Sequence, residues 1–137
     1  MGYLAGLGCI GRHGLLIEPQ SGANHRLGAV FTNISNLDEY FDNTNEHMWI
    51  QDFCAKCGKC IQKCPGNTIK KEASVNENGY ITCIDYKKCG VEFGDKFGCN
   101  VCVAVCPFTT VGYDKIKESF LKRINERETN NEISINR

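Results

Sequence analysis

The cysteines of this chain are the residues whose type and spacing indicate a chemical function. Cys54, Cys57, Cys60 and Cys64 are separated by two, two and three residues, and Pro65 follows the last of them. Three thiolates at two-residue intervals can bind three iron corners of one cubane cluster, so the fourth corner must be reached from elsewhere in the chain. The run therefore predicts a [4Fe-4S] cluster and one-electron chemistry.

A second, incomplete run predicts a second cluster. Cys99, Cys102 and Cys106 precede Pro107, and Cys89 lies upstream. In two-cluster proteins the fourth cysteine of each run serves the other cluster. We expect cluster I to be bound by Cys54, Cys57, Cys60 and Cys106. For cluster II we expect Cys64, Cys99, Cys102 and Cys89, with Cys83 as the substitute for Cys89.

Three other uses of cysteine fit this pattern less well. Structural zinc prefers two separated cysteine pairs rather than a close triplet. A disulfide scaffold would suit a secreted chain, but no apolar signal segment is visible and bridges do not require this spacing twice. A redox Cys-x-x-Cys pair does not explain four cysteines in one run.

Charge and hydropathy suggest neither a nucleic-acid nor a membrane protein. Sixteen basic and sixteen acidic residues balance among 137, and no basic patch indicates nucleic acid. The apolar runs are shorter than the ~20 residues of a membrane helix. We expect a cytoplasmic protein, because a reducing compartment suits oxygen-sensitive clusters.

The pattern predicts a small α+β, loop-rich, ferredoxin-like domain. We expect a glycine-rich segment with a polar connector at 1–49, the two-cluster domain at 50–112, and a helix with a polar tail at 113–137. The stripe of Ile116, Phe120 and Ile124 predicts a helix over 114–128 that packs on the cluster domain, followed by a frayed tail.

Shorter elements are predicted from local residue preferences. We expect strands at 27–32, around 15–17, and at 80–83 after a turn at 76–79. We expect one helical turn at 67–71. Gly6, Gly8 and Gly11 spell G-x-G-x-x-G, but the strand, helix and acidic residue of a dinucleotide site are missing. Cys9 is interpreted as a small buried side chain.

The whole chain resembles the C-terminal part of cobalamin-dependent reductases, namely reductive dehalogenases and epoxyqueuosine reductases. The resemblance covers about residues 2–112. It is carried by the stretches Gly6–Ile17 (GLGCIGRHGLLI), Arg26–Asn33 (RLGAVFTN), Phe53–Pro65 (FCAKCGKCIQKCP), Asp85–Cys89 (DYKKC) and Cys99–Thr109 (CNVCVAVCPFT). The dehalogenase-like stretch favours Cys89 in cluster II, whereas Cys83–Tyr86 is similar to a cysteine segment of the epoxyqueuosine branch.

In that family, the resemblance implies that the clusters pass electrons singly to a cobalamin. Gly8, Gly11 and His13 would then lie near the corrin ring. No catalytic residue is predicted, because the family's proton donor and most of its corrinoid site precede the matching region. The implied partner is a redox protein or the missing cobalamin-binding catalytic region. The chain itself is expected to transfer electrons, or to be part of a reductase acting on organohalides or epoxides.

Overall fold

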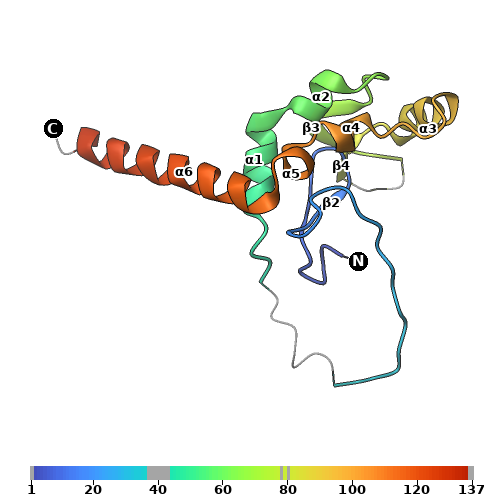
Figure 1. Ribbon diagram of the computed structural model, residues 1–137, viewed down its shortest axis with the longest axis horizontal. Helices are drawn as coiled ribbons and strands as arrows, with labels where there is room; N and C mark the ends of the chain where they lie inside the picture. Colours follow the sequence, from blue (N-terminus) through green and yellow to red (C-terminus); the bar gives the residue numbers. More distant parts are fainter. Residues whose placement is uncertain (1, 37–43, 78, 80, 136–137) are drawn as a thin grey trace.

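The computed structural model describes residues 2–36, 44–77, 79 and 81–135. Short helices and two small antiparallel sheets form a body from which one long helix projects (Figure 1). The predicted α+β class is confirmed. The elements in chain order are β1 (Cys9–Ile10), β2 (Leu16–Ile17), α1 (Trp49–Cys57), α2 (Lys59–Lys63), β3 (Ile69–Val75), β4 (Ile81–Ile84), α3 (Tyr86–Asp95), α4 (Val101–Ala104), α5 (Pro107–Thr110) and α6 (Tyr113–Ile135).

Several predicted elements are present. β2 lies within the expected strand at 15–17, and β4 follows the expected turn, in which the Gly79 amide donates to the Asn76 carbonyl at 3.0 Å. The predicted C-terminal helix is α6, but it continues to Ile135. Residues 129–135 of the expected polar tail are thus helical in the structure, and their fraying stays a prediction.

Two local predictions were wrong because pairing partners decide strand formation. Residues 27–32 belong to no strand, and Val30 and Phe31 are 93% and 88% exposed. High β propensity reflects packing in a sheet, and this segment has no neighbouring strand in the described chain. The expected helical turn at 67–71 is instead the start of β3, because Ile69 pairs with Ile84 of β4.

An aromatic core joins the helices around the cysteine runs. Trp49 and Phe53 of α1 contact Phe108 of α5, with ring centroids 5.7 and 5.0 Å away. Phe120 of α6 packs on both α1 rings, at 5.8 and 5.6 Å. The predicted packing of the C-terminal helix on the cluster domain is thus confirmed, and these contacts fix α1, α5 and α6 relative to one another.

The glycine-rich segment packs directly on this core. Cys9 and Ile17 are fully buried in it, which confirms the interpretation of Cys9 as a buried side chain. Gly22 has φ +62°, and a Cβ there would lie 2.4 Å from the Phe108 carbonyl oxygen. Only glycine permits both that backbone conformation and so close an approach, so residues 2–23 and the cysteine-bearing helices form one body.

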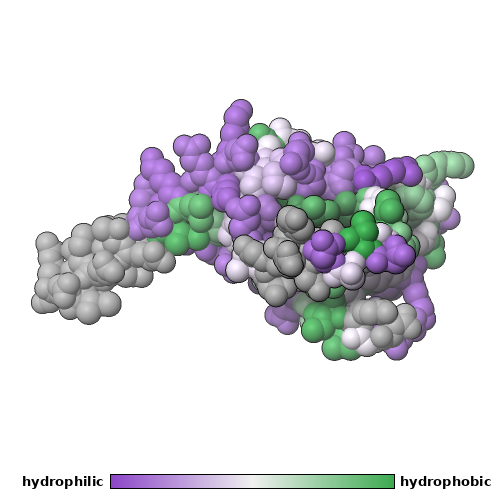
Figure 2. Space-filling view, turned by 90° about the horizontal axis from the view of Figure 1, so that it is seen from below, coloured by the Kyte–Doolittle hydropathy of each residue, from purple (hydrophilic) through white to green (hydrophobic). Residues whose placement is uncertain are grey.

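Hydrophilic residues cover much of the face seen in Figure 2. In this view from below, apolar patches lie among them on the body and along α6 (Figure 2). Among the described residues, no helix is both long enough and apolar enough to cross a membrane.

Candidate iron–sulfur site

The first cysteine run is divided between two short helices. Cys54 and Cys57 lie on α1, which ends at Gly58, and Cys60 lies on α2. Gly58 has φ +63°, a left-handed conformation that glycine adopts without steric cost. It allows α2 to begin at once in a new direction. Pro65 and Pro107 each follow a cysteine in extended conformation, as expected where a proline ends a ligand loop.

The structure brings Cys54, Cys57, Cys60 and Cys106 around one cavity. All four line it together with Phe53 and Phe108. Burial and, to a smaller extent, the neighbouring thiols of Cys106, Cys60 and Cys57 together raise the pKa of the Cys54 thiol to about 12. The same causes raise the pKa of Cys60 to about 11. These four are the residues predicted for cluster I.

The four thiols of this cavity are the donor type that an iron–sulfur cluster takes. No three His, Cys, Asp or Glu side chains in the described part of the chain converge tightly enough for one metal ion. The cysteines nevertheless lie near enough to affect one another's ionisation. A [4Fe-4S] cluster is held by four Cys thiolates, so this donor set fits such a group.

A second group of cysteines lies beside the first. Burial raises the pKa of Cys102 on α4, and Cys89 and Cys99 raise it further. Cys89 lies on α3, whose first turn is capped by Asp85 through a 3.2 Å hydrogen bond from the Lys88 amide. Capping of this kind stabilises a helix start by about 1 kcal/mol. The structure thus places three of the cysteines predicted for cluster II together.

Cys83 and Cys64 occupy different surroundings. Cys83 lies on β4 and lines a hollow of about 600 Å³ together with Cys54 and residues of the glycine-rich segment. The Cys64 sulfur accepts a hydrogen bond from the Thr68 amide at 3.3 Å and lies 3.2 Å from the Thr68 hydroxyl. Burial would raise the pKa of Cys64, but these hydrogen bonds lower it below its ordinary value.

A comparison with known protein families decides the class of this site. A family described as the 4Fe-4S dicluster domain matches residues 53–119, which include both cysteine runs. Residues 53–119 are thus similar to a 4Fe-4S dicluster domain. The predicted ferredoxin-like domain is therefore confirmed, although the match does not assign individual ligands.

Similar proteins extend the resemblance beyond the dicluster domain. A tetrachloroethene reductive dehalogenase of Sulfurospirillum multivorans is 37% identical over 115 residues, which is 77% of this chain and 22% of that protein. An epoxyqueuosine reductase of Vibrio cholerae serotype O1 is 32% identical over 113 residues, 76% of this chain and 28% of that protein. The predicted resemblance to these two groups is confirmed. The chain spans between a fifth and a third of these relatives.

His13 lies at the edge of the dicluster domain's first cavity. It is 3% exposed and lines the cavity with Arg12. Its Nδ1 accepts a 3.2 Å hydrogen bond from the Leu15 amide, whereas Nε2 is buried and has no partner in the described structure. Burial lowers the pKa of His13 to about 4. The ring is therefore neutral near pH 7, and because Nδ1 accepts, the proton must be on Nε2.

Gly8 and Gly11 have clear packing roles. A Cβ on Gly8 would lie 2.1 Å from the Ile17 carbonyl oxygen. A Cβ on Gly11 would lie 2.6 Å from Ile17 Cδ1 and 2.9 Å from His13 Cε1. Both glycines allow β1 and its following turn to approach β2 and the histidine ring. Their predicted contact with a corrin ring stays a prediction.

Arg12 is the site residue that the sequence did not indicate. Its backbone amide donates a hydrogen bond to Cys54, and the residue lines both the first cavity and the hollow next to Cys83. Amide donors to ligand sulfur tune cluster potentials. The only signal in the sequence was its position between Gly11 and His13.

Proposed function

We propose that this chain carries two [4Fe-4S] clusters and relays single electrons to a corrinoid or a partner reductase. The observation that carries the proposal is the cavity that Cys54, Cys57, Cys60 and Cys106 line beside the glycine-rich segment. Cluster I would take these four thiolates. Cluster II would take Cys64, Cys89, Cys99 and Cys102, a set supported by the grouping of its last three members.

The two proposed cluster sites lie close enough to exchange electrons. Cys60 of the first set lies close enough to Cys102 of the second for their charges to interact. Cys54 and Arg12 line both the first cavity and the hollow of about 600 Å³ formed with the glycine-rich segment. An electron on cluster I would therefore be next to this hollow, which is where we place the acceptor. When bound, a corrinoid would supply a cobalt centre that accepts one electron at a time.

We also propose that His13 tunes cluster I through its Nε2–H. That donor is buried without a partner, and the residue lines the cavity that would hold the cluster. A buried polar group without a partner is costly, so a donor fixed in this position indicates a missing acceptor. A cluster sulfur would be that acceptor, and the hydrogen bond would stabilise the reduced, more negative cluster.

Replacing His13 with leucine is expected to lower the potential of cluster I by about 40 mV, which corresponds to about 1 kcal/mol of lost hydrogen bonding. His13→Gln, which keeps an N–H donor, should restore part of the difference. Potentiometric titration followed by electron paramagnetic resonance (EPR) measures both clusters in the same sample, and cluster II serves as the internal control. Equal cluster I potentials in wild type and His13→Leu would contradict the hydrogen bond.

Electron transfer to a corrinoid can be tested with hydroxocobalamin. The chain is loaded anaerobically with iron and sulfide, reduced, and mixed with an excess of the cobalamin. A corrinoid site predicts that the rate of cluster oxidation saturates with cobalamin concentration, because electron transfer then occurs within a bound complex. A rate that rises linearly without saturation would show random collision and no such site.

A second candidate is a part or subunit of a cobalamin-dependent reductase. The names and greater lengths of the similar proteins favour it. If the cobalamin-loaded chain itself turns over tetrachloroethene or an epoxide, this enzyme assignment replaces the electron-transfer one. The ten cysteines are all unbridged, which supports the proposal of a reducing cytoplasmic location.

A further inference from the structure

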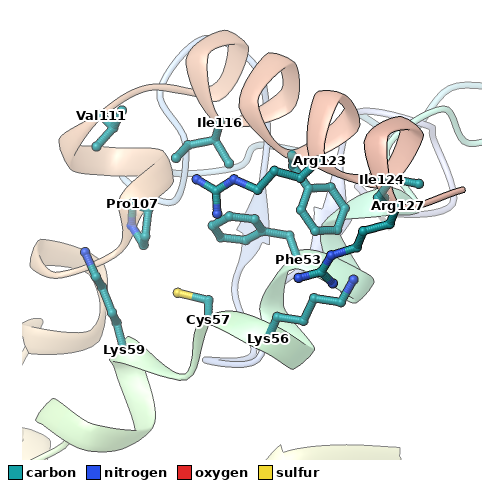
Figure 3. A pocket seen from close by; sticks show the side chains of 11 residues that line it. Phe53, Lys56, Cys57, Lys59, Pro107, Val111, Ile116, Arg123, Ile124 and Arg127 are labelled. Carbon is teal, nitrogen blue, oxygen red and sulfur yellow. The ribbon is translucent and has the colours of Figure 1, made fainter. Parts of the chain in front are cut away.

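A groove between α1 and α6 opens beside the proposed cluster I. It has a volume of about 500 Å³ and is formed by residues of α1, α5 and α6 with the start of α2. Its apolar lining is Phe53, Pro107, Val111, Ile116, Phe120 and Ile124. Figure 3 shows the Cys57 sulfur directed into the space between the two helical walls. We name this feature the α1/α6 groove.

The charged side chains of the α1/α6 groove are all basic. Lys56 and Lys59 come from the α1 side, and Arg123 and Arg127 come from α6 (Figure 3). Among the residues that the structure describes, no aspartate or glutamate lines the groove. Lys56 Nζ lies 5.1 Å from the centre of the Phe120 ring, and Arg123 donates to the Ser119 hydroxyl at 3.2 Å. Within the described residues, none of these four cations forms an ion pair with a carboxylate.

The groove and the cluster I cavity share a wall. Phe53, Cys57 and Pro107 line both spaces. Cys57 would therefore be a cluster ligand on one side and part of an open, positively charged surface on the other. Lys59 also lies close enough to Cys106 to affect its ionisation. A redox group held in or over the groove would be separated from the cluster by little more than one thiolate.

We infer that the α1/α6 groove is the docking site of an acidic one-electron donor protein. Carboxylates of the donor would pair with the basic side chains, and its redox group would face Cys57. The charge complementarity would steer the encounter and orient the two proteins, while the apolar lining would exclude water at the contact. The inference rests on the proposed electron-transfer function and adds the side from which electrons enter.

The electron transfer step balances with an acidic flavodoxin as donor. Its anionic hydroquinone loses one electron and becomes the neutral semiquinone. Cluster I gains that electron and changes from the 2+ to the 1+ state. No bond breaks and no proton is transferred, so the step needs only correct placement of the two redox groups.

The test is a stopped-flow measurement with reduced flavodoxin as the probe. Lys56→Glu/Arg123→Glu reverses two groove charges, and Lys115→Glu/Lys122→Glu makes the same change in net charge at exposed positions of α6 outside the groove. We expect the groove variant to be reduced about tenfold more slowly at low salt and to lose most of its salt dependence. The control variant should stay within about twofold of wild type.

Two outcomes would overturn the docking site. Equal slowing of both variants would mean that net charge alone steers the donor. Unchanged rates in both would mean that the donor binds elsewhere. Reduced methyl viologen, a small cationic donor, is the reference: it should reduce wild type and both variants. If methyl viologen reduces the variants at the wild-type rate, slow reduction by flavodoxin reflects lost docking and not a damaged cluster. If the wild-type chain accepts no electron from methyl viologen, the proposed electron-transfer function itself is contradicted.

Discussion

Replacing Cys89 with alanine is expected to remove cluster II and to lower the iron content from about eight to about four ions per chain. The reason is geometric, because Cys89 lies with Cys99 and Cys102, the other side chains placed together for that cluster. Iron and acid-labile sulfide are measured after anaerobic reconstitution, and EPR shows which cluster remains. Cluster I should persist, since its four cysteines line a separate cavity.

Cys83→Ala is the matched control for this prediction. Cys83 faces the hollow beside the glycine-rich segment, so its loss should leave both clusters in place. A third variant, Cys9→Ala, tests whether loss of any buried cysteine lowers iron content, because Cys9 is fully buried in the core. The assignment of Cys89 fails if Cys83→Ala loses the second cluster while Cys89→Ala retains it.

Replacing Phe108 with alanine is expected to destabilise the protein by about 3–5 kcal/mol. Phe108 is 2% exposed and contacts Trp49, Phe53 and Tyr113, so its removal leaves a cavity where α1, α5 and α6 meet. A loss of this size is a large part of the 5–15 kcal/mol typical of a domain. Trp49, the single tryptophan, reports unfolding in guanidinium by its fluorescence.

Phe97→Ala provides the control, because it is the same substitution at a fully exposed ring. Its effect should stay within about 0.5 kcal/mol. Both variants are compared with their clusters loaded under anaerobic conditions. Where unfolding is irreversible, the half-life at a fixed guanidinium concentration replaces the midpoint. Similar losses in the two variants would show that the aromatic core does not hold the helices as described.

The cysteine runs predicted the class of the site because iron binding requires fixed spacing. Residue types and spacing indicated a dicluster domain, and the comparison confirms it. The choice between Cys83 and Cys89 could not be made from spacing alone. It depends on the neighbours of each cysteine in the folded chain, because Cys89 lies near Cys102 whereas Cys83 lines the hollow beside the glycine-rich segment.

Predictions from local residue preferences were least reliable where residues distant in the sequence decide the secondary structure. Ile69 becomes the first residue of β3 because Ile84 pairs with it, although the preceding residues suggested a turn of helix. Val30 and Phe31 favour a strand, but no strand lies beside them in the described chain. The role proposed for His13 as a hydrogen-bond donor to cluster I could not be predicted from the sequence. It depends on the burial of Nε2 and on the tautomer, which follow from the contacts of His13 with Leu15 and the first cavity.

The central claim is that this chain holds two [4Fe-4S] clusters that accept electrons singly. Stepwise reduction of the anaerobically reconstituted chain, followed by EPR and by iron and sulfide analysis, tests it most directly. We expect about eight iron and eight sulfide ions per chain, and two one-electron steps that give magnetically interacting reduced clusters. A chain that binds about four iron ions or fewer, or that accepts only one electron, would contradict the two-cluster relay.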